Sequence, residues 1–130
     1  MKSLPPYFLS LLRIVAALMF MIHGTQKLFA WPLNQPGVPV PLMSQMGAAG
    51  VLEALGGALL LLGLFSRPVA FLLAGQMAVA FFQAHFPRGF LPNLNGGEPA
   101  VLYCFIWLYI CVAGPGPLSI DALWRRRPRA

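Results

Sequence analysis

Residues 51–63, VLEALGGALLLLG, form an almost unbroken apolar stretch that contains a single carboxylate, Glu53. The chain around this stretch is similarly apolar, since 58% of its 130 residues are hydrophobic and 9% are charged. An ordinary soluble domain is ~45–50% apolar and ~25% charged. The composition therefore excludes a soluble globular domain and indicates a small membrane protein.

Four apolar runs follow one another along the chain, and each is bounded by proline, glycine or a charged residue. A helix needs ~20 residues to cross a bilayer core ~30 Å thick, which suits runs of this length. A closed β-barrel does not fit, because the runs are too long and show no alternation of apolar and polar residues. We therefore expect an all-α, integral membrane four-helix bundle in which residues 1–130 form a single membrane domain. The expected spans are residues 6–29, 43–64, 68–86 and 99–113, followed by a basic tail at residues 118–130.

The basic residues are distributed unevenly about these spans. The net charge of +6 comes from nine basic and three acidic residues, and four arginines fall in the closing sequence RRRPRA. With four spans, Lys2, Arg67 and this arginine cluster share one side of the membrane, whereas Arg88 lies on the other, where Lys27 also ends the first span. The positive-inside rule then predicts that both termini are cytoplasmic. We interpret the charge as sidedness and contact with the lipid bilayer, not as nucleic-acid binding.

The connection after the first span, residues 31–43, has the sequence WPLNQPGVPVPLM, with four prolines and no charge. A helix is excluded there because each proline removes a backbone donor. The loop is apolar enough to lie on the membrane surface, with Trp31 in the interfacial belt. We expect it to act as a lid on the outer side.

Several polar and ionisable side chains interrupt the apolar runs. Each ionisable one costs ~2.5–3.5 kcal/mol on insertion, so each is a functional candidate. At ~1.5 Å per residue, one group of them reaches a common level near the outer end of the bundle, with Glu53 and Gln76 beneath it. We expect a polar pocket between the four helices at this level. The expected catalytic residues are Glu53 and His23, and the expected ligand-binding residues are Arg13, Lys27, Gln76, Gln83, His85 and Glu98.

Three of these residues also suit a simpler role at the ends of spans. Lys27 fits a side chain that extends to the lipid headgroups. Glu98 precedes a proline and fits a residue that the positive end of a helix dipole favours. His85 fits a ring placed in the membrane interface. These roles are compatible with ligand binding, and both interpretations stay open.

Glu53 is the sharpest signal, because an isolated carboxyl in an apolar span has to be protonated or paired with a cation. The cations available on the first span are Arg13, His23 and Lys27. His23 and Lys27 are four residues apart and share one face of the helix. The alternatives are a working acid–base group and a purely structural ion pair.

Other kinds of chemistry find little support. No Glu-x-x-His or comparable spacing lies within a span, so we expect no metal site. Haem held between His23 and His85 is disfavoured, because paired histidines alone carry little information. Cys104 and Cys111 are ~10 Å apart on a helix, too far for a disulfide. Glycines in the spans, among them Gly24, Gly57 and Gly75, predict close helix packing.

The segment after the fourth span has a structural rather than chemical pattern. The sequence Gly-Pro-Gly-Pro at residues 114–117 ends a helix. Ser119 then offers a side-chain oxygen to start a short helix, with Asp121 in its first turn. We expect these two residues to order this end of the bundle.

Taken in order, the motifs of the chain resemble those of the DoxX family of small bacterial inner-membrane proteins. The motifs are Arg13, His23-Gly24-x-x-Lys27-Leu28, Glu53-x-x-Gly56-Gly57, Gly63-x-x-x-Arg67, Ala84-His85, Gly96-Gly97-Glu98 and Gly114-Pro115-Gly116-Pro117-Leu118-Ser119-Ile120-Asp121. The resemblance implies a four-helix bundle that crosses the bacterial inner membrane several times. It also implies redox chemistry, because the family takes its name from a terminal-oxidase or thiosulfate:quinone oxidoreductase subunit. The proline-rich first outer loop departs from the family pattern.

Two functions follow from these observations. The favoured one is a membrane subunit supporting quinone-linked redox chemistry, in which His23, Lys27 or Glu98 meets the quinone oxygens and Glu53 exchanges protons. The chain has no haem, flavin or thiol motif, so an electron-donating partner protein would be needed. The alternative is a non-enzymatic carrier for a proton or small solute, or an assembly partner of a membrane complex. A homo-oligomer is compatible with either function.

Overall fold

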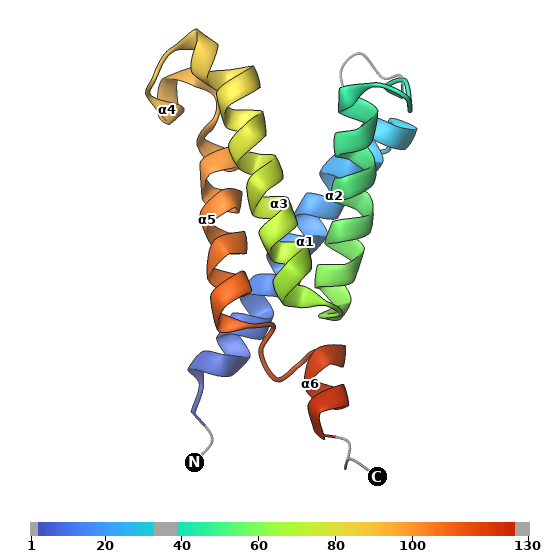
Figure 1. The fold of residues 1–130 in the computed structure, drawn as a ribbon, viewed down its shortest axis with the longest axis vertical. Coiled ribbons are helices and arrows are strands. Elements are labelled where there is room, and N and C mark those ends of the chain that lie inside the picture. Colours follow the sequence, from blue (N-terminus) through green and yellow to red (C-terminus); the bar gives the residue numbers. More distant parts are fainter. Residues whose placement is uncertain (1–2, 33–38, 127–130) are drawn as a thin grey trace.

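The computed structural model describes residues 3–32 and 39–126, and this part of the chain is helical without any strand. Residues 33–38 of the expected lid and residues 127–130 of the basic tail lie outside the described residues. The all-α helical bundle is confirmed. The bounds are α1 Pro5–Phe29, α2 Gln45–Leu62, α3 Ser66–Ala80, the π-helical turn η1 Phe81–His85, the 3₁₀ turn η2 Phe86–Arg88, α4 Pro92–Asn95, α5 Glu98–Ala113 and α6 Ile120–Arg126 (Figure 1).

Four apolar helices cover the four apolar runs of the sequence. The helices at Pro5–Phe29, Gln45–Leu62 and Ser66–Arg88 are long and apolar enough to cross a membrane. The fourth, α5, has only 16 residues and a length of ~24 Å. The chain is therefore a membrane protein with three full-length helices and one short helix in its bundle.

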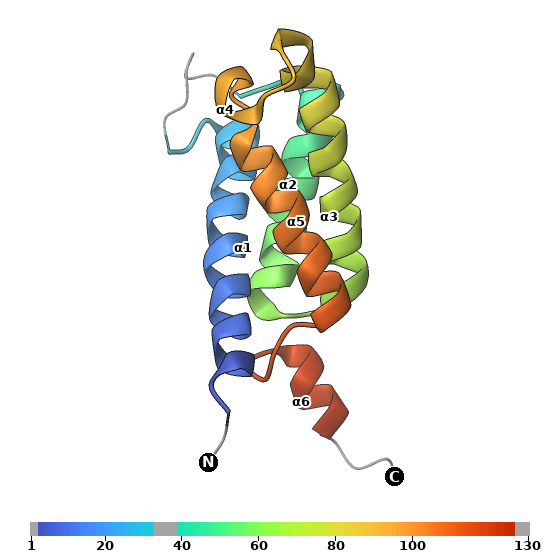
Figure 2. The ribbon, with the colours of Figure 1, turned by 90° about the vertical axis from the view of Figure 1, so that its left-hand side faces the viewer.

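The bundle is built from two helix pairs. Helix α1 packs mainly on α2, and α3 packs mainly on α5, while α1 and α5 have little direct contact. The two pairs diverge toward the end that carries α4 (Figure 1). Seen from the side, α5 crosses the bundle obliquely next to α1 (Figure 2).

Small residues allow α1 and α2 to approach closely. A Cβ at Gly24 on α1 would lie 2.8 Å from the carbonyl oxygen of Gly50 on α2. A Cβ at Gly57 would lie 2.9 Å from that of Met21. Gly75 differs, because a Cβ there would meet nothing within 4 Å. The packing role expected of the glycines is thus confirmed between α1 and α2 and wrong for Gly75.

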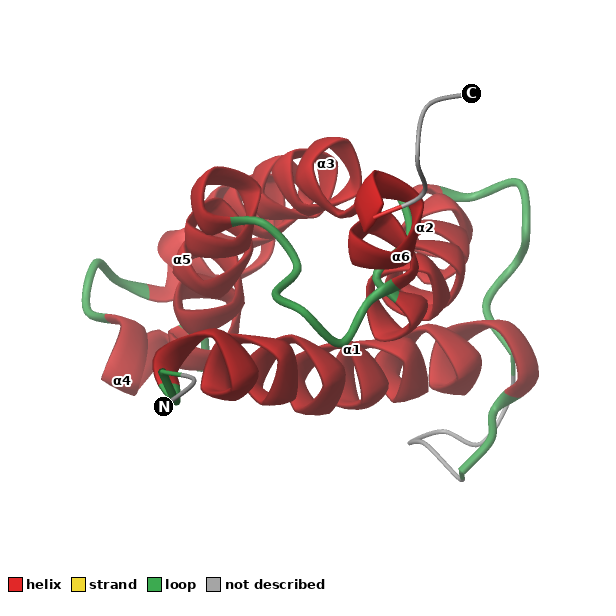
Figure 3. Ribbon diagram, turned by 90° about the horizontal axis from the view of Figure 1, so that it is seen from below, coloured by secondary structure: helices red, strands yellow, loops and turns green. Residues whose placement is uncertain are grey.

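Arg13 is the main polar residue at the end of the bundle opposite α4. Its guanidinium is fully buried, and it donates to the carbonyl oxygens of Pro115 at 2.5 Å and Leu118 at 2.7 Å. The loop that carries these carbonyls crosses the end of the bundle between α5 and α6 (Figure 3). Arg13 is thus absent from the expected pocket. Arg13 and Lys27 are 14 residues apart, which is ~21 Å along the helix. The two side chains therefore do not meet, although they share one face of the helix.

Ser119 and Asp121 complete this end of the bundle. Ser119 Oγ accepts a hydrogen bond from the N–H of Ala122 at 3.1 Å, which confirms that it starts the short helix α6. The two carboxylate oxygens of Asp121 accept hydrogen bonds from the N–H groups of Phe65 and Ser66, each at 2.9 Å. Asp121 therefore ties α6 to the beginning of α3, as a residue that orders the structure.

Candidate functional site

Three of the expected site residues meet between α1, α2 and α3. Lys27 Nζ lies 2.5 Å from Oε1 and 2.6 Å from Oε2 of Glu53. The Glu53 side chain is 3% exposed, against 23% for Lys27. Lys27, and not Arg13 or His23, is thus the cation that pairs with the buried carboxylate.

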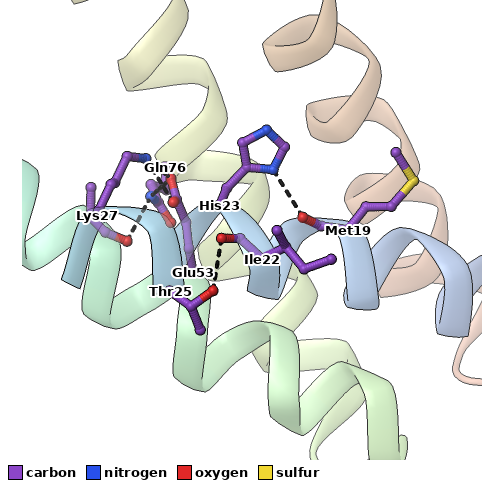
Figure 4. Close-up of polar contacts among 8 residues, drawn as sticks. Met19, Ile22, His23, Thr25, Lys27, Glu53 and Gln76 are labelled. Atoms are coloured by element: carbon purple, nitrogen blue, oxygen red, sulfur yellow. Dashed lines mark hydrogen bonds and ion pairs between the residues drawn. The ribbon is translucent and has the colours of Figure 1, made fainter. Parts of the chain in front are cut away.

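Gln76 joins this ion pair from α3. Its Nε2 lies 3.2 Å from Glu53 Oε1 and 3.4 Å from the carbonyl oxygen of Ala49. Its Oε1 is buried and has no hydrogen-bond partner in the described part of the chain. Figure 4 shows Lys27, Glu53 and Gln76 converging from three helices, with His23 apart from them. We call these three residues the polar cluster.

His23 lies outside the polar cluster, and its side chain is exposed on the bundle rather than buried in it. The expectation of a histidine packed among polar groups is therefore wrong. A rotation of ~40° separates positions i and i+4, and the long Lys27 side chain reaches inward where an imidazole does not. His23 Nδ1 lies 2.9 Å from the carbonyl oxygen of Met19. Because a carbonyl only accepts, Nδ1 carries the proton, and Nε2 is left to face outward from α1 (Figure 4).

His23 instead forms part of an apolar groove between α1 and α5. The groove has a volume of about 510 Å³. It follows one face of each helix, because the lining positions on α1 and α5 repeat at helical spacing. Its polar groups are few and include His23 and Glu98. The groove is lined by Leu12, Val15, Ala16, Met19, His23, Glu98, Pro99, Leu102, Tyr103 and Ile106.

Tyr103 is a groove residue that the sequence analysis missed. Its ring packs edge-on against His23 at 6.1 Å and is stacked on Trp107 at 5.9 Å. Tyr103 and Trp107 are four residues apart, which places them on one face of α5. This spacing was the signal available in the sequence. The described groove therefore offers a hydroxyl, an imidazole and a carboxylate, that of Glu98, among apolar walls.

Gln83 and His85 occupy separate positions near the α4 end. Gln83 Oε1 accepts a hydrogen bond from Nε2 of Gln45 at the start of α2. His85 Nδ1 lies 3.3 Å from the carbonyl oxygen of Asn95. Both belong to the π-helical turn η1, which shifts side chains away from the register of α3. Gln83 and His85 were assigned to the pocket from their depth in the membrane, and this assignment is wrong. Neither residue joins the polar cluster or lines the groove.

The residues expected to form a single pocket are therefore divided between two separate sites in the described structure. The polar cluster lies inside the bundle, and the groove with His23 and Glu98 lies on its α1–α5 face. Within residues 3–32 and 39–126, no group of three or more His, Cys, Asp or Glu side chains is arranged to hold a metal ion.

Comparison with known proteins agrees with the assignment of the chain to a membrane. The chain is 44% identical over 123 residues to a Haemophilus influenzae protein named only as an uncharacterized protein, covering 89% of this chain and 90% of that one. It is 27% identical over 126 residues to the inner membrane protein YphA of Escherichia coli, covering 89% of each chain. No solved structure matches significantly. The DoxX family profile matches residues 8–86, and the chain belongs to the DoxX family of membrane proteins.

Proposed function

We propose that this DoxX-family protein binds a quinone-type lipid in the groove between α1 and α5 and supports redox chemistry in the membrane. The observation that carries the proposal is the composition of the groove. A lipid with an isoprenoid tail needs a long apolar surface open to the bilayer, and its ring needs a few directed polar groups. The groove combines about 510 Å³ of largely apolar space with His23, Glu98 and Tyr103.

His23 is the residue best prepared to contact the ring. Its Nδ1 is engaged by the Met19 carbonyl at 2.9 Å, which orients the imidazole. The outward Nε2 accepts a hydrogen bond when the imidazole is neutral and donates one to a carbonyl oxygen when it is protonated. Reduction of a quinone to a quinol takes up two electrons and two protons. A titratable imidazole at the groove wall suits that requirement.

Glu98 and Glu53 provide two further carboxyl groups. Glu98 is the first residue of α5 and lies at the same groove as His23, exposed to the outside. Glu53 lies in the polar cluster between α1, α2 and α3, paired with Lys27. We assign Glu98 to ligand contact at the groove mouth and Glu53 to proton exchange inside the bundle, with Lys27 as the cation that holds it.

The electrons have to come from another protein, because the sequence contains no motif for haem, flavin or a redox thiol pair. A membrane subunit that works with an electron-donating partner fits a chain of this size. We place the protein in the bacterial inner membrane, in agreement with the name of the Escherichia coli relative. Both termini are on the cytoplasmic side in this proposal, and the groove mouth is near the periplasmic side.

The test measures binding of a short-chain quinone to the purified full chain in mild detergent. Quenching of tryptophan fluorescence is the readout. We expect saturable binding that His23→Leu weakens at least ~10-fold, because the imidazole contact is lost. Thr25→Val is the matched control on the same helix, since in the described structure its Oγ1 donates to the Ile22 carbonyl of the same helix at 2.9 Å. Binding that is absent from the wild type, or equal in the two variants, would overturn the proposal.

The polar cluster favours a second candidate function. A buried carboxylate, an ammonium and an amide whose oxygen has no partner among the described residues form the kind of site that proton or solute carriers use inside a membrane. A carrier would transport its solute into liposomes in response to an ion gradient and would need Glu53 and Lys27, but not His23. Uptake that depends on these residues and proceeds without added quinone favours this candidate.

A further inference from the structure

A second hollow lies at the opposite end of the bundle, where α6 approaches the beginning of α3. It has a volume of about 470 Å³ and shares no lining residue with the groove among the residues described. Arg67 and Arg125 line it with guanidinium groups, and Phe65 and Trp124 line it with aromatic rings. Figure 3 views this end of the bundle. We call this hollow the α3–α6 pocket.

Arg67 is held in position by the end of α5. Its Nη1 donates to the carbonyl oxygens of Cys111, at 3.0 Å, and Val112. These contacts leave Nη2 and Nε for another acceptor. A Cβ at Gly114 would lie 3.2 Å from Nη2, so the glycine leaves room for the guanidinium. Arg67 is an exposed residue whose guanidinium is oriented by these two carbonyl oxygens, so it is a preorganised donor.

Asp121 is the carboxylate among the described residues that line the pocket, and it is already hydrogen-bonded. Both oxygens of Asp121 accept hydrogen bonds from backbone N–H groups, those of Phe65 and Ser66. Ser66 also lines the pocket, and its buried Oγ has no hydrogen-bond partner within the described chain. Among the described lining residues, two guanidinium groups against one hydrogen-bonded carboxylate give a net positive charge. The pocket is thus suited to an anion.

The aromatic residues indicate which kind of anion the pocket suits. Phe65 is 56% exposed and Trp124 is 48% exposed, with their rings packed edge to face at 5.9 Å. Tryptophan is typical of the level at which lipid headgroups meet acyl chains. The pocket lies where apolar α3 begins, so it is at this level of the bilayer. A small soluble anion has no apolar part to contact these two rings, whereas the glycerol and acyl chains of a lipid would pack against them.

We infer that the α3–α6 pocket binds the headgroup of an anionic glycerophospholipid. The phosphodiester lies at Arg67 and Arg125, and the glycerol and upper acyl chains lie against Phe65 and Trp124. Basic pockets on the cytoplasmic side of membrane helices bind such headgroups, with each basic residue contributing to the affinity. The site is separate from the groove and does not depend on quinone binding.

The test uses native mass spectrometry of the purified full chain in detergent with dioctanoyl phosphatidylglycerol or dioctanoyl phosphatidylcholine. We expect the anionic lipid to bind about tenfold more tightly than the zwitterionic one. Arg67→Gln and Arg125→Gln should each reduce this preference by roughly fivefold. Arg88→Gln is the matched control, because Arg88 lies in η2 at the other end of the bundle and should leave the preference unchanged.

Three outcomes overturn the inference. Equal affinity for the two lipids removes the role of headgroup charge. An equal loss in the Arg88→Gln control shows general electrostatic attraction and not a site. Displacement of the lipid by inorganic phosphate at the same concentration shows a site for a soluble anion. If Arg67→Gln fails to fold because α5 loses its contacts, Arg125→Gln still decides the result, since Arg125 is an exposed residue of α6.

Discussion

Lys27 on α1 holds both carboxylate oxygens of Glu53 on α2, at 2.5 and 2.6 Å from its Nζ. Taking two charges out of water is costly, and only their mutual contact and further hydrogen bonds offset that cost. The close approach of α1 and α2 at Gly24 and Gly50 brings the two side chains within reach. The ion pair and the close glycine contact therefore stabilise the same placement of α1 against α2.

Removing one partner of this pair should destabilise the protein more than removing both. We expect Lys27→Met or Glu53→Leu to lower the free energy of unfolding by roughly 2–3 kcal/mol, below the ~3–5 kcal/mol of fully buried pairs because Lys27 keeps some exposure. The double variant should lose less than either single variant, so it recovers more than ~2–3 kcal/mol of the summed losses. Unfolding in mixed micelles measures this cycle. Strictly additive losses would contradict the coupling.

Glu53→Gln separates the chemical role of this residue from its structural role. The amide fills nearly the same volume, so the variant should insert and fold, with Lys27 turning toward the headgroups. We expect proton-coupled activity to be lost or its pH dependence to shift. Activity in proteoliposomes across a pH range measures this. A stable variant with the wild-type profile leaves Glu53 a purely structural ion-pair partner.

Gly24 on α1 and Gly75 on α3 offer a matched pair of substitutions, because the first is tightly packed and the second is not. Gly24→Leu forces a side chain into the α2 backbone and should cost more than ~3 kcal/mol, since overpacking a tight contact has no room to relax. Gly75→Leu faces open space and should stay within ~0.5 kcal/mol of the wild type. Thermal unfolding of the purified proteins compares them. Similar melting temperatures would show that α1 and α2 are less closely packed than described.

Arg13→Met should loosen the end of the bundle that α6 covers. The carbonyl oxygen of Leu118 loses this donor, and that of Pro115 keeps the 3.4 Å hydrogen bond from Ser10 Oγ. A buried acceptor that loses a partner costs ~1–3 kcal/mol. Hydrogen exchange in residues 116–122 should become faster, while exchange at the α4 end is unchanged. The control is Arg88→Met, an exposed residue of η2. Unaltered protection of residues 116–122 would show that other contacts hold the loop.

The orientation of the bundle can be tested with reporter fusions. Arg67 and Arg125 line one pocket at one end of the bundle, whereas Arg88 lies in η2 beyond the other end of α3. The positive-inside rule places the first end in the cytoplasm. A C-terminal green fluorescent protein should therefore fluoresce, and a C-terminal alkaline phosphatase should be inactive. An active phosphatase would reverse the assigned sides of the groove and the α3–α6 pocket.

Hydropathy and helix-ending residues were enough to predict the bundle. The apolar runs extend over several helical turns, and the ends depend on local chemistry. Pro5 begins α1, Ser44 Oγ accepts from the N–H of Gly47 at 3.0 Å to begin α2, and Gly63 ends it with φ of 70°. Such signals act within a few residues, so they can be read without knowing the tertiary structure.

The arrangement of polar side chains depended on the tertiary structure. Helix geometry predicts the depth of Arg13, His23 and Lys27 and their shared face, but not which neighbouring helix each one meets. That choice follows from the pairing of α1 with α2 and of α3 with α5, and from the length of each side chain. Lys27 is long enough to reach Glu53, whereas the shorter His23 remains on the groove between α1 and α5. A rotation of tens of degrees about a helix axis decides between these environments, and only packing against the other helices determines that rotation.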